Sequence, residues 1–193
     1  MIRALYDWVF SLARHKNANW ALAGVSFVES SFFPIPPDVL LIPMVIARRQ
    51  KWIFLALLCT IASVLGGILG YFIGAFLYQQ VAEPIFNFYG YMDRFDRFSE
   101  IFSNWGWWFV FIAGLTPFPY KVITISAGLA GLSLPVFIVA SIVSRGLRFF
   151  VVSALLYAFG EPIRKFIEER LGLMFTLAVI LLLGGFAAVK FLF

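Results

Sequence analysis

Long apolar stretches alternate with short polar segments along the chain. Residues 52–78 contain no charged residue and no proline, and residues 132–159 and 171–193 form two further long apolar stretches. An α-helix rises about 1.5 Å per residue, so each stretch is long enough to cross the roughly 30 Å hydrocarbon core of a bilayer. The pattern predicts three transmembrane helices, the last of them over residues 171–193.

Prolines interrupt two other apolar segments, residues 19–47 and 105–131. A proline removes a helical hydrogen bond and clashes with the preceding turn. Irregular backbone at membrane depth persists only where protein buries it or where it faces a wet cavity. We therefore predict two re-entrant hairpins, each made of two half-helices joined by a Pro-x-Pro turn. The turn prolines are Pro34, Pro36, Pro117 and Pro119.

The two broken segments resemble each other in sequence. Residues 33–39 (FPIPPDV) align with residues 116–122 (TPFPYKV), and the long stretch after each segment leads into Glu-Pro-Ile. Such symmetry is typical of inverted repeats, whose two halves enter the membrane from opposite sides. The expected fold is an all-α integral membrane protein with two inverted re-entrant hairpins, about three transmembrane helices and interfacial amphipathic helices.

Residues 1–17 are amphipathic rather than uniformly apolar. Their apolar positions recur at helical spacing, and Arg3, Asp7 and Arg14 interrupt the apolar run. This pattern favours a helix lying in the membrane interface over a secretory signal peptide. The expected organisation is an interfacial helix over residues 1–17, a membrane domain over 18–170 and a transmembrane helix over 171–193.

The distribution of basic residues predicts the orientation. If each hairpin returns to the side from which it enters, nine basic residues lie on the side of the N-terminus and three lie on the other side. Cytoplasmic loops carry an excess of lysine and arginine. We therefore expect a multi-pass protein with a cytoplasmic N-terminus.

Composition narrows the class of protein. Hydrophobic residues make up 62% of the chain and charged residues 13%, against about 45–50% and about 25% in soluble domains. These proportions exclude a soluble globule and a disordered chain. In a membrane protein a net charge of +5 reports orientation and contact with anionic lipids rather than binding to nucleic acid.

A glycine stripe runs along the first predicted span. Gly66, Gly70 and Gly74 stand four residues apart, a spacing that lets another helix approach closely. Packing of a hairpin against this stripe is the favoured interpretation, and a homo-oligomer interface is the alternative.

Five charged residues are expected at membrane depth. Each such charge costs roughly 2.5–3.5 kcal/mol on an insertion scale, so intramembrane charges usually pair or face a cavity. The set comprises two acids and three bases, which suits an anionic headgroup, because arginine offers a fork of donors to phosphate. The acids are candidates to carry protons or to gate a wet groove between the two hairpins. A purely structural ion-pair cluster is the alternative. The five residues are Glu29, Asp38, Lys121, Arg145 and Arg148.

The Asp38 and Lys121 positions align in the repeat, so opposite charges are expected at the two hairpin tips. Arg145 and Arg148 stand three residues apart and therefore share one face of a helix.

Most enzyme chemistries lack their residues in this chain. It holds one histidine, His15, and one cysteine, Cys59. No His/Cys metal cluster, phosphate-binding glycine loop or zincin helix is present in the sequence. We therefore expect a protein that is not an enzyme and that needs no metal or cofactor.

The first broken segment resembles a known family signature. Residues 29–38 (ESSFFPIPPD) resemble the Glu-x4-Pro-x-Pro-x-Asp/Glu motif of the DedA membrane proteins, also called the VTT or SNARE-associated domain. Residues 114–121 (GLTPFPYK) with 126–128 (SAG) are similar to the second signature in its YqaA-type form, and residues 144–148 (SRGLR) to the basic step that follows. In many members arginines occupy the hairpin positions that here hold Gly114 and Tyr120, with Lys121 adjacent.

The resemblance implies two facing re-entrant hairpins and a role in lipid movement at the bacterial inner membrane. The expected function is a flippase- or scramblase-like transporter of a phosphate-containing lipid, such as a phospholipid or undecaprenyl phosphate, with proton coupling as in some members. Two alternatives stay open. One is a proton- or ion-coupled transporter of a small solute, and the other is a membrane adaptor that transports nothing.

Overall fold

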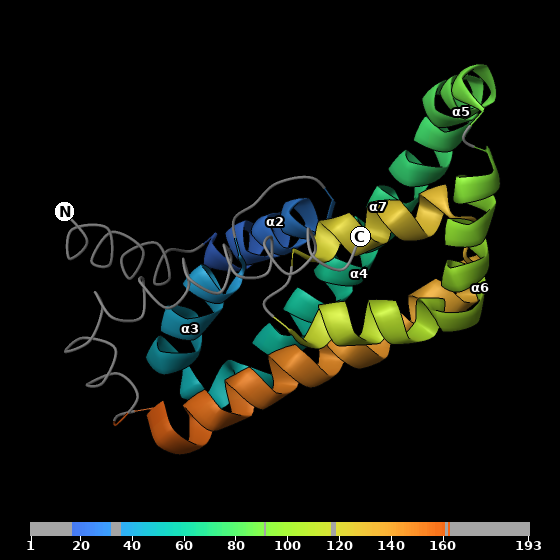
Figure 1. Cartoon of the computed structure of the whole chain (residues 1–193). Coiled ribbons are helices and arrows are strands. Elements are labelled where there is room, and N and C mark those ends of the chain that lie inside the picture. Colours follow the sequence, from blue (N-terminus) through green and yellow to red (C-terminus); the bar gives the residue numbers. More distant parts are fainter. Residues whose placement is uncertain (1–16, 32–35, 91, 117–118, 161, 163–193) are drawn as a thin grey trace.

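The computed structural model describes residues 17–31, 36–90, 92–116, 119–160 and 162 of the chain (Figure 1). The predicted interfacial helix falls almost entirely outside these residues, and the predicted C-terminal span at 171–193 lies wholly outside them. Of the four turn prolines, Pro36 and Pro119 are described, whereas Pro34 and Pro117 lie outside the described residues.

All regular structure in the described part of the chain is helical. The elements are α2 (Ala18–Ser31), α3 (Asp38–Ala47), the 3₁₀ turn η1 (Arg49–Lys51), α4 (Trp52–Leu77), the π-helical turn η2 (Tyr78–Ala82), α5 (Glu83–Tyr89), α6 (Met92–Leu115), α7 (Tyr120–Leu129) and the helix Leu134–Gly160.

Within the described residues, two helices are long and apolar enough to cross a membrane. One is the continuous helix Arg49–Ala82, and the other is the helix Leu134–Gly160. The second begins two residues after the predicted start at Leu132, because Gly131 turns the chain at φ 72°. The carbonyl of Ser133 then accepts the first helical hydrogen bond, from the amide of Phe137. The length and apolar composition of the two helices are what a membrane-spanning helix requires.

The helix that leads into the second proline break begins earlier than predicted. Residue 105 lies inside α6, which runs unbroken for 24 residues. Gly106 lies inside this helix and leaves room for a close contact with Leu132. A Cβ there would lie 2.6 Å from a methyl carbon of Leu132. The segment before residue 105 and the half-helix after it are therefore one element. Entry of the two hairpins from opposite membrane faces stays a prediction.

The glycine stripe of α4 carries both broken segments. A Cβ at Gly66 would lie 2.0 Å from the Phe27 carbonyl oxygen of α2, and one at Gly74 would lie 1.9 Å from the Ile125 carbonyl oxygen of α7. Only glycine permits such approach of two backbones. The favoured interpretation of the stripe is confirmed, with the addition that two helices use it. A homo-oligomer would need another surface.

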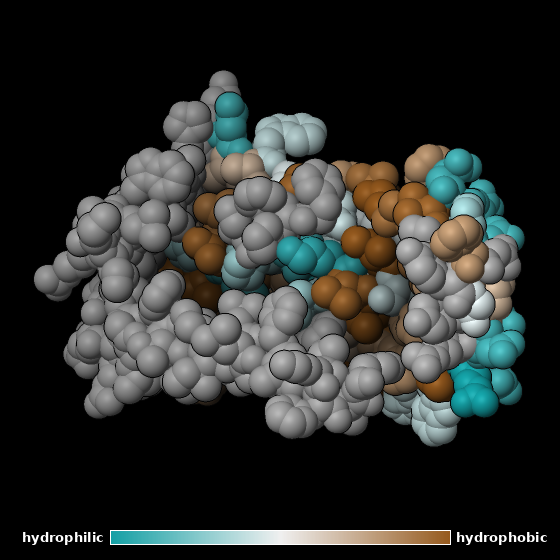
Figure 2. All heavy atoms as spheres, turned by 45° about the horizontal axis from the view of Figure 1, so that its top comes forward, coloured by the Kyte–Doolittle hydropathy of each residue, from teal (hydrophilic) through white to brown (hydrophobic). Residues whose placement is uncertain are grey.

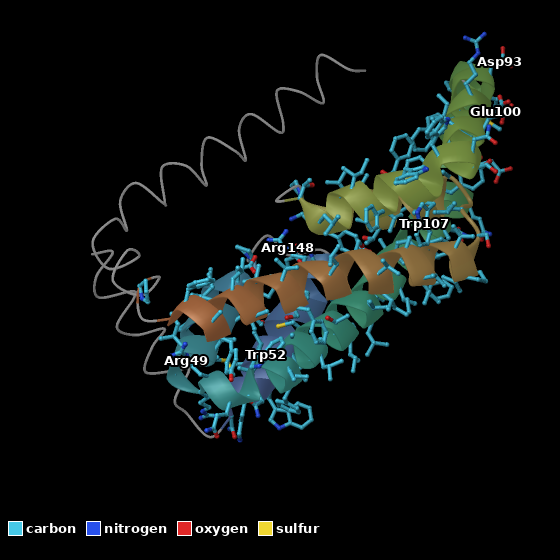
Figure 3. All side chains as sticks on the ribbon, turned by 90° about the horizontal axis from the view of Figure 1, so that it is seen from below. Arg49, Trp52, Asp93, Glu100, Trp107 and Arg148 are labelled. Atoms are coloured by element: carbon cyan, nitrogen blue, oxygen red, sulfur yellow. The ribbon has the colours of Figure 1, made fainter. Side chains whose placement is uncertain are left out.

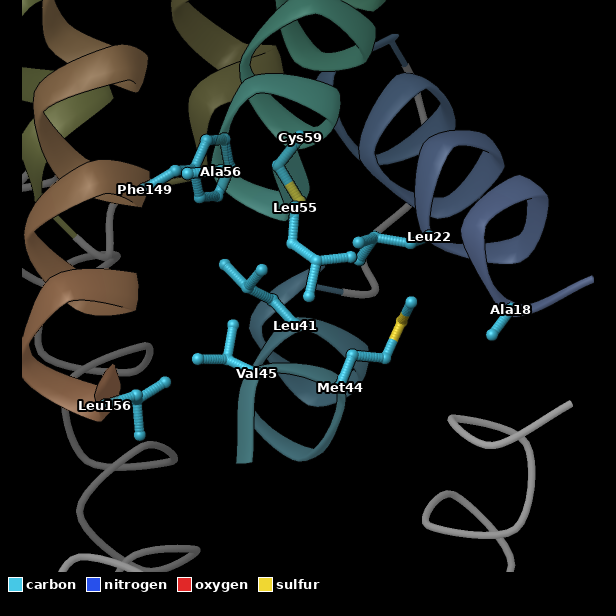
Figure 4. Packing of buried hydrophobic residues seen from close by; sticks show 10 residues of the cluster. All are labelled: Ala18, Leu22, Leu41, Met44, Val45, Leu55, Ala56, Cys59, Phe149 and Leu156. Carbon is cyan, nitrogen blue, oxygen red and sulfur yellow. The ribbon is translucent and has the colours of Figure 1, made fainter. Parts of the chain in front are cut away.

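Two hydrophobic cores lie on either side of the middle of the molecule. The first joins Leu22 of α2, Leu41 of α3 and Leu55 of α4 with Phe149 (Figure 4). The second joins Val110 of α6 and Ala127 of α7 with Phe137. The helix Leu134–Gly160 contributes to both cores and so fastens the two broken segments to α4.

The outward face of α4 is apolar and exposed, as expected for contact with lipid chains. Hydrophilic residues gather at the end of the molecule formed by α5 and the start of α6 (Figure 2). The lipid-facing side chains recur every three or four residues: Ile53, Phe54, Leu57, Ile61, Leu65, Leu69, Phe72 and Phe76.

The opposite end of the molecule is closed by an arginine and an aromatic stack. The Arg49 guanidinium donates to the Tyr157 carbonyl, 3.2 Å from its Nε, and so caps the end of the helix Leu134–Gly160. The Trp52 ring stacks on the Tyr157 ring at 5.6 Å. A cation at a helix C-terminus is favourable because the last carbonyls carry partial negative charge.

Candidate functional site

Arg145 is the most deeply buried charge in the described part of the chain, with 2% of its side chain exposed. Its Nε donates to the Ser63 hydroxyl at 2.6 Å, and its Nη2 donates to Glu29 Oε2 at 2.7 Å. The guanidinium carbon lies 4.7 Å from the centre of the Tyr120 ring and 4.8 Å from that of Phe149. The cation is therefore held from the sides by hydrogen bonds and across its faces by aromatic rings.

The Glu29 carboxylate belongs to a small hydroxyl network. Ser30 donates to Glu29 Oε2 at 3.0 Å, and the hydroxyls of Ser30 and Ser63 lie 2.7 Å apart. A buried ion pair is tolerated only when further hydrogen bonds satisfy its remaining atoms. These hydroxyls supply such bonds, and they tie α2 to α4 at the level of Arg145.

Arg148 forms the second ion pair, one helical turn away. Its Nη2 donates to Asp38 Oδ2 at 2.6 Å, and its Nη1 donates to the Thr116 carbonyl at 2.7 Å. This pair is less buried, with 18% of the Arg148 side chain and 20% of that of Asp38 exposed. In Figure 3 Arg148 lies near the middle of the helix Leu134–Gly160, away from Arg49 and Trp52 at one end of the molecule and from Asp93 and Glu100 of α6 at the other.

The Asp38 carboxylate is only half satisfied. Its Oδ2 atom bonds Arg148, whereas its Oδ1 atom is buried and has no hydrogen-bond partner among the described residues. Asp38 is the first residue of α3 and directly follows Pro37, at the point where the first broken segment resumes as a helix.

Each arginine connects both broken segments. Arg145 bonds Glu29 of α2 and stacks on Tyr120, the first residue of α7. Arg148 bonds Asp38 of α3 and the carbonyl of Thr116, just after α6. The structure thus gathers four of the five predicted site residues into two neighbouring ion pairs.

Lys121 is the exception. The repeat alignment predicts opposite charges at the two tips, and Asp38 and Lys121 lie in the first turns of α3 and α7. The partner of Asp38 is Arg148. Lys121 stands in the first turn of α7, is partly exposed and forms no ion pair with any described residue. Among these five residues the charge is therefore unbalanced by one positive unit.

Sequence reasoning missed the polar groups that support the site. The Tyr120 hydroxyl donates to Ser141 at 2.5 Å, and the Thr124 hydroxyl donates to the Ser30 carbonyl at 3.2 Å, where α7 meets α2. The available signal is the occurrence of hydroxyl residues at buried helical positions inside apolar stretches. It names candidates but not their partners.

Gly114 and Tyr120, the two positions that the family resemblance aligns with arginines, have structural uses in this chain. A Cβ at Gly114 would lie 2.1 Å from the Ser144 hydroxyl, so α6 meets the helix Leu134–Gly160 too closely for a larger residue. Tyr120 is fully buried beneath Arg145. The guanidinium that meets the second segment therefore comes from the long helix.

The described residues bring no three histidine, cysteine, aspartate or glutamate side chains together in a way that could hold a metal ion. Two of the described acids, Glu29 and Asp38, each pair with one arginine instead.

Comparison with known proteins agrees with the membrane fold. The chain is 40% identical over 168 residues to an "Uncharacterized protein" of Haemophilus influenzae. This alignment covers 85% of the present chain and 87% of the relative. The chain is also 35% identical over 151 residues to an "Uncharacterized protein HI0703 homolog" of Histophilus somni, with 78% of each chain covered. No solved structure matches the chain.

The family model described as the VTT domain matches residues 35–158, which is more than half of the chain. The matched region contains Asp38, Lys121 and both arginines of the site, and Glu29 lies just before it. The VTT domain, which defines the DedA proteins, is a membrane domain generally linked to transport rather than to enzymatic catalysis. The chain belongs to the VTT domain family.

Proposed function

We propose that this protein moves a phosphate-bearing lipid across the bilayer, in the manner of a flippase or scramblase. The observation that carries the proposal is the charge imbalance of the site: two arginines pair with two carboxylates, and Lys121 adds a third positive charge that forms no ion pair with a described residue. An uncompensated cation at membrane depth is costly. A phosphate headgroup would compensate it.

Chemistry favours phosphate over other anions at this place. A guanidinium binds phosphate through two parallel N–H donors, and the Lys121 ammonium adds a point charge at the start of α7. The substrate class comprises phospholipids and undecaprenyl phosphate, whose apolar chains would stay in the bilayer while the headgroup passes the hairpin tips.

The two carboxylates give the proposal its coupling step. When a phosphate approaches the arginines, Glu29 or Asp38 loses part of its countercharge. Uptake of a proton would neutralise the carboxylate and preserve the local balance. Proton-coupled transport is therefore the proposed energy source, with passive scrambling as the uncoupled form.

Flipping in proteoliposomes tests the function. Fluorescent phosphatidylglycerol and a short-chain polyprenyl phosphate would be reconstituted with the full chain, and their transfer between leaflets measured by quenching from outside. We expect faster transfer than in protein-free vesicles. Lys121→Gln and Glu29→Gln should reduce it to the protein-free rate.

Arg97→Gln is the matched control, because Arg97 is an exposed cation of α6 outside the ion pairs. Its flipping rate should equal that of the wild type. Wild-type vesicles that flip neither lipid would overturn the proposed function.

A specific observation favours one rival, the adaptor that transports nothing: the four charges of the two ion pairs already neutralise one another. This rival predicts that Lys121→Gln leaves the protein folded and changes no flux. A solute transporter predicts pH changes inside the vesicles on addition of a solute, without lipid flipping. The same vesicles therefore separate all three functions.

The proposed location is the bacterial inner membrane, with a cytoplasmic N-terminus. Basic residues Arg49 and Lys51 mark one end of the helix Arg49–Ala82, and Glu83 follows its other end. The positive-inside rule assigns the basic end to the cytoplasm.

A further inference from the structure

The two arginines of the site differ in how replaceable their partners are. Arg145 has 2% of its side chain exposed and Glu29 has 14%, whereas Arg148 and Asp38 have 18% and 20%. A ligand that arrives from solvent therefore displaces the partner of Arg148 at a lower cost in free energy than the partner of Arg145.

Arg145 is held too completely to exchange its anion. It bonds Ser63 and Glu29 and lies against the rings of Tyr120 and Phe149. Separation of Glu29 from Arg145 would leave two charges in the protein interior without their counter-ions, which is strongly unfavourable.

Arg148 can exchange its anion while it stays in place. Its two terminal nitrogens serve different partners: Nη2 bonds Asp38, and Nη1 bonds the Thr116 carbonyl. If another anion replaces Asp38 at Nη2, the bond to Thr116 still holds the guanidinium at the end of α6.

Asp38 has less to lose than an ordinary ion-paired carboxylate. One of its oxygens is buried without a hydrogen-bond partner among the described residues. Such an atom has lost its hydrogen bonds to water without gaining others, which raises the free energy of the folded state. Movement of the Asp38 side chain toward water would relieve that cost. A phosphate group, with more acceptor oxygens than a carboxylate, would take the vacated donors of Arg148.

We propose that Arg148 is the guanidinium that contacts the phosphate group, that Asp38 is the anion the phosphate displaces, and that Arg145 is a positioning residue that keeps its partner throughout. The inference rests on the proposed function for its substrate class. It adds a division of roles between two arginines that the sequence presents as equivalent.

Binding, rather than flipping, tests this division. The full chain in phosphatidylcholine nanodiscs would be titrated with phosphatidic acid, whose headgroup is a phosphate monoester, and the bound lipid counted by native mass spectrometry. A parallel arm with inorganic phosphate in the buffer distinguishes a lipid headgroup from free phosphate as the ligand. Both sources share the chemistry at Arg148, but only the lipid is expected to bind at low concentration.

Asp38→Asn should tighten phosphatidic acid binding by about tenfold, because it removes the competing anion and keeps the shape of the side chain; tenfold corresponds to about 1.4 kcal/mol. Arg148→Gln should weaken binding by tenfold or more. The double variant should resemble Arg148→Gln alone. Arg49→Gln is the matched control, since Arg49 binds helix carbonyls far from the pair, and its affinity should equal that of the wild type.

Lysine variants separate contact from positioning. Lysine keeps the charge but loses the fork of donors, so Arg148→Lys should weaken phosphatidic acid binding with little change in melting temperature. Arg145→Lys should lower the melting temperature more than Arg148→Lys and weaken binding less. If Arg145→Lys fails to fold, the part-exposed Asp38 and Arg148 variants still decide the matter.

Two results would overturn the inference: weaker phosphatidic acid binding by Asp38→Asn, or a greater loss of affinity in folded Arg145→Lys than in Arg148→Lys. Absence of phosphatidic acid binding by the wild type would overturn it as well. The proposed function fails separately, because binding that follows the expected order without any lipid flipping contradicts transport and supports the role of Arg148.

Discussion

The Nη2 atom of Arg145 lies 2.7 Å from the Oε2 atom of Glu29, although 116 residues separate the two in the chain. The contact joins the helix Leu134–Gly160 to the first broken segment, at a place where 2% of the Arg145 side chain and 14% of that of Glu29 are exposed. Because Tyr120 of the second segment stacks on the same guanidinium, the position of both segments depends on this cation.

Removal of either partner of this pair should destabilise the protein severely. Glu29→Gln leaves the Arg145 cation buried without its anion, and Arg145→Met leaves the carboxylate in the same state. Each should lower the free energy of unfolding by about 3–5 kcal/mol. Thermal unfolding of the purified chain in detergent measures the loss, with Arg97→Met as a surface control.

The double variant Glu29→Gln/Arg145→Met should cost clearly less than the sum of the two single changes, since no unpaired charge then remains. Additive losses would show that the two residues act independently, contrary to the observed pair.

The glycine stripe gives a second prediction, with an internal control. A Cβ at Gly74 would lie 1.9 Å from a backbone oxygen of α7, so Gly74→Ala must push α7 off α4 and should lower the melting temperature markedly. A Cβ at Gly24 of α2 would have no neighbouring atom within 4 Å, so Gly24→Ala should be neutral or stabilise the helix by up to about 1 kcal/mol. Equal effects of the two changes would contradict the packing described for the stripe.

Much of the architecture could be predicted because the bilayer imposes strong rules on sequence. An apolar stretch long enough to span, a proline inside another such stretch and a glycine every fourth residue each have few structural solutions. These rules identified both broken segments, the contact face of α4 and the charges of the site.

The pairing of charges could not be predicted, because it depends on contacts between distant segments. Helical spacing shows that Arg145 and Arg148 share a face, but not which carboxylate each would meet. The repeat alignment predicted opposite charges at the two tips, those of Asp38 and Lys121. The alignment named no partner for either residue, and the partner of Asp38 is Arg148, which comes from the long helix. The contact of Tyr120 with Arg145 could not be predicted either, because an aromatic residue in an apolar stretch is usually part of the hydrophobic core.

Tyr120 has two separable roles that substitutions can distinguish. Tyr120→Phe removes the hydrogen bond to Ser141 but keeps the ring beneath Arg145, and should cost about 1 kcal/mol of stability. Tyr120→Leu removes the ring as well, and its larger cost should shrink in an Arg145→Met background, where no cation needs the ring. Melting temperatures of the four combinations measure the coupling. An unchanged cost of Tyr120→Leu in that background would show that Arg145 does not depend on the ring.

Arg49 should contribute to stability through the end of a helix rather than through the site. Arg49→Gln removes the cationic cap on the Tyr157 carbonyl and should cost on the order of 1 kcal/mol. Lys51→Gln is the matched control and should cost less, because Lys51 is a neighbouring exposed cation that forms no ion pair with a described residue. Thermal unfolding at low and high salt makes the comparison, since screening weakens an exposed charge effect. Equal losses would contradict the cap.

The final prediction concerns orientation in the membrane. The helix Arg49–Ala82 has 34 residues and extends over about 50 Å, so both of its ends lie beyond a hydrocarbon core of about 30 Å. Gln50 and Gln80 are exposed near the two ends, and the native Cys59 is buried between them. A membrane-impermeant maleimide should therefore label Gln80→Cys in spheroplasts and Gln50→Cys only in inverted vesicles, while the wild type stays unlabelled in both. The physical reason is the excess of arginine and lysine beside Gln50, which the positive-inside rule retains in the cytoplasm. The reverse labelling pattern would place the N-terminus outside and would reverse the side from which each broken segment is proposed to enter.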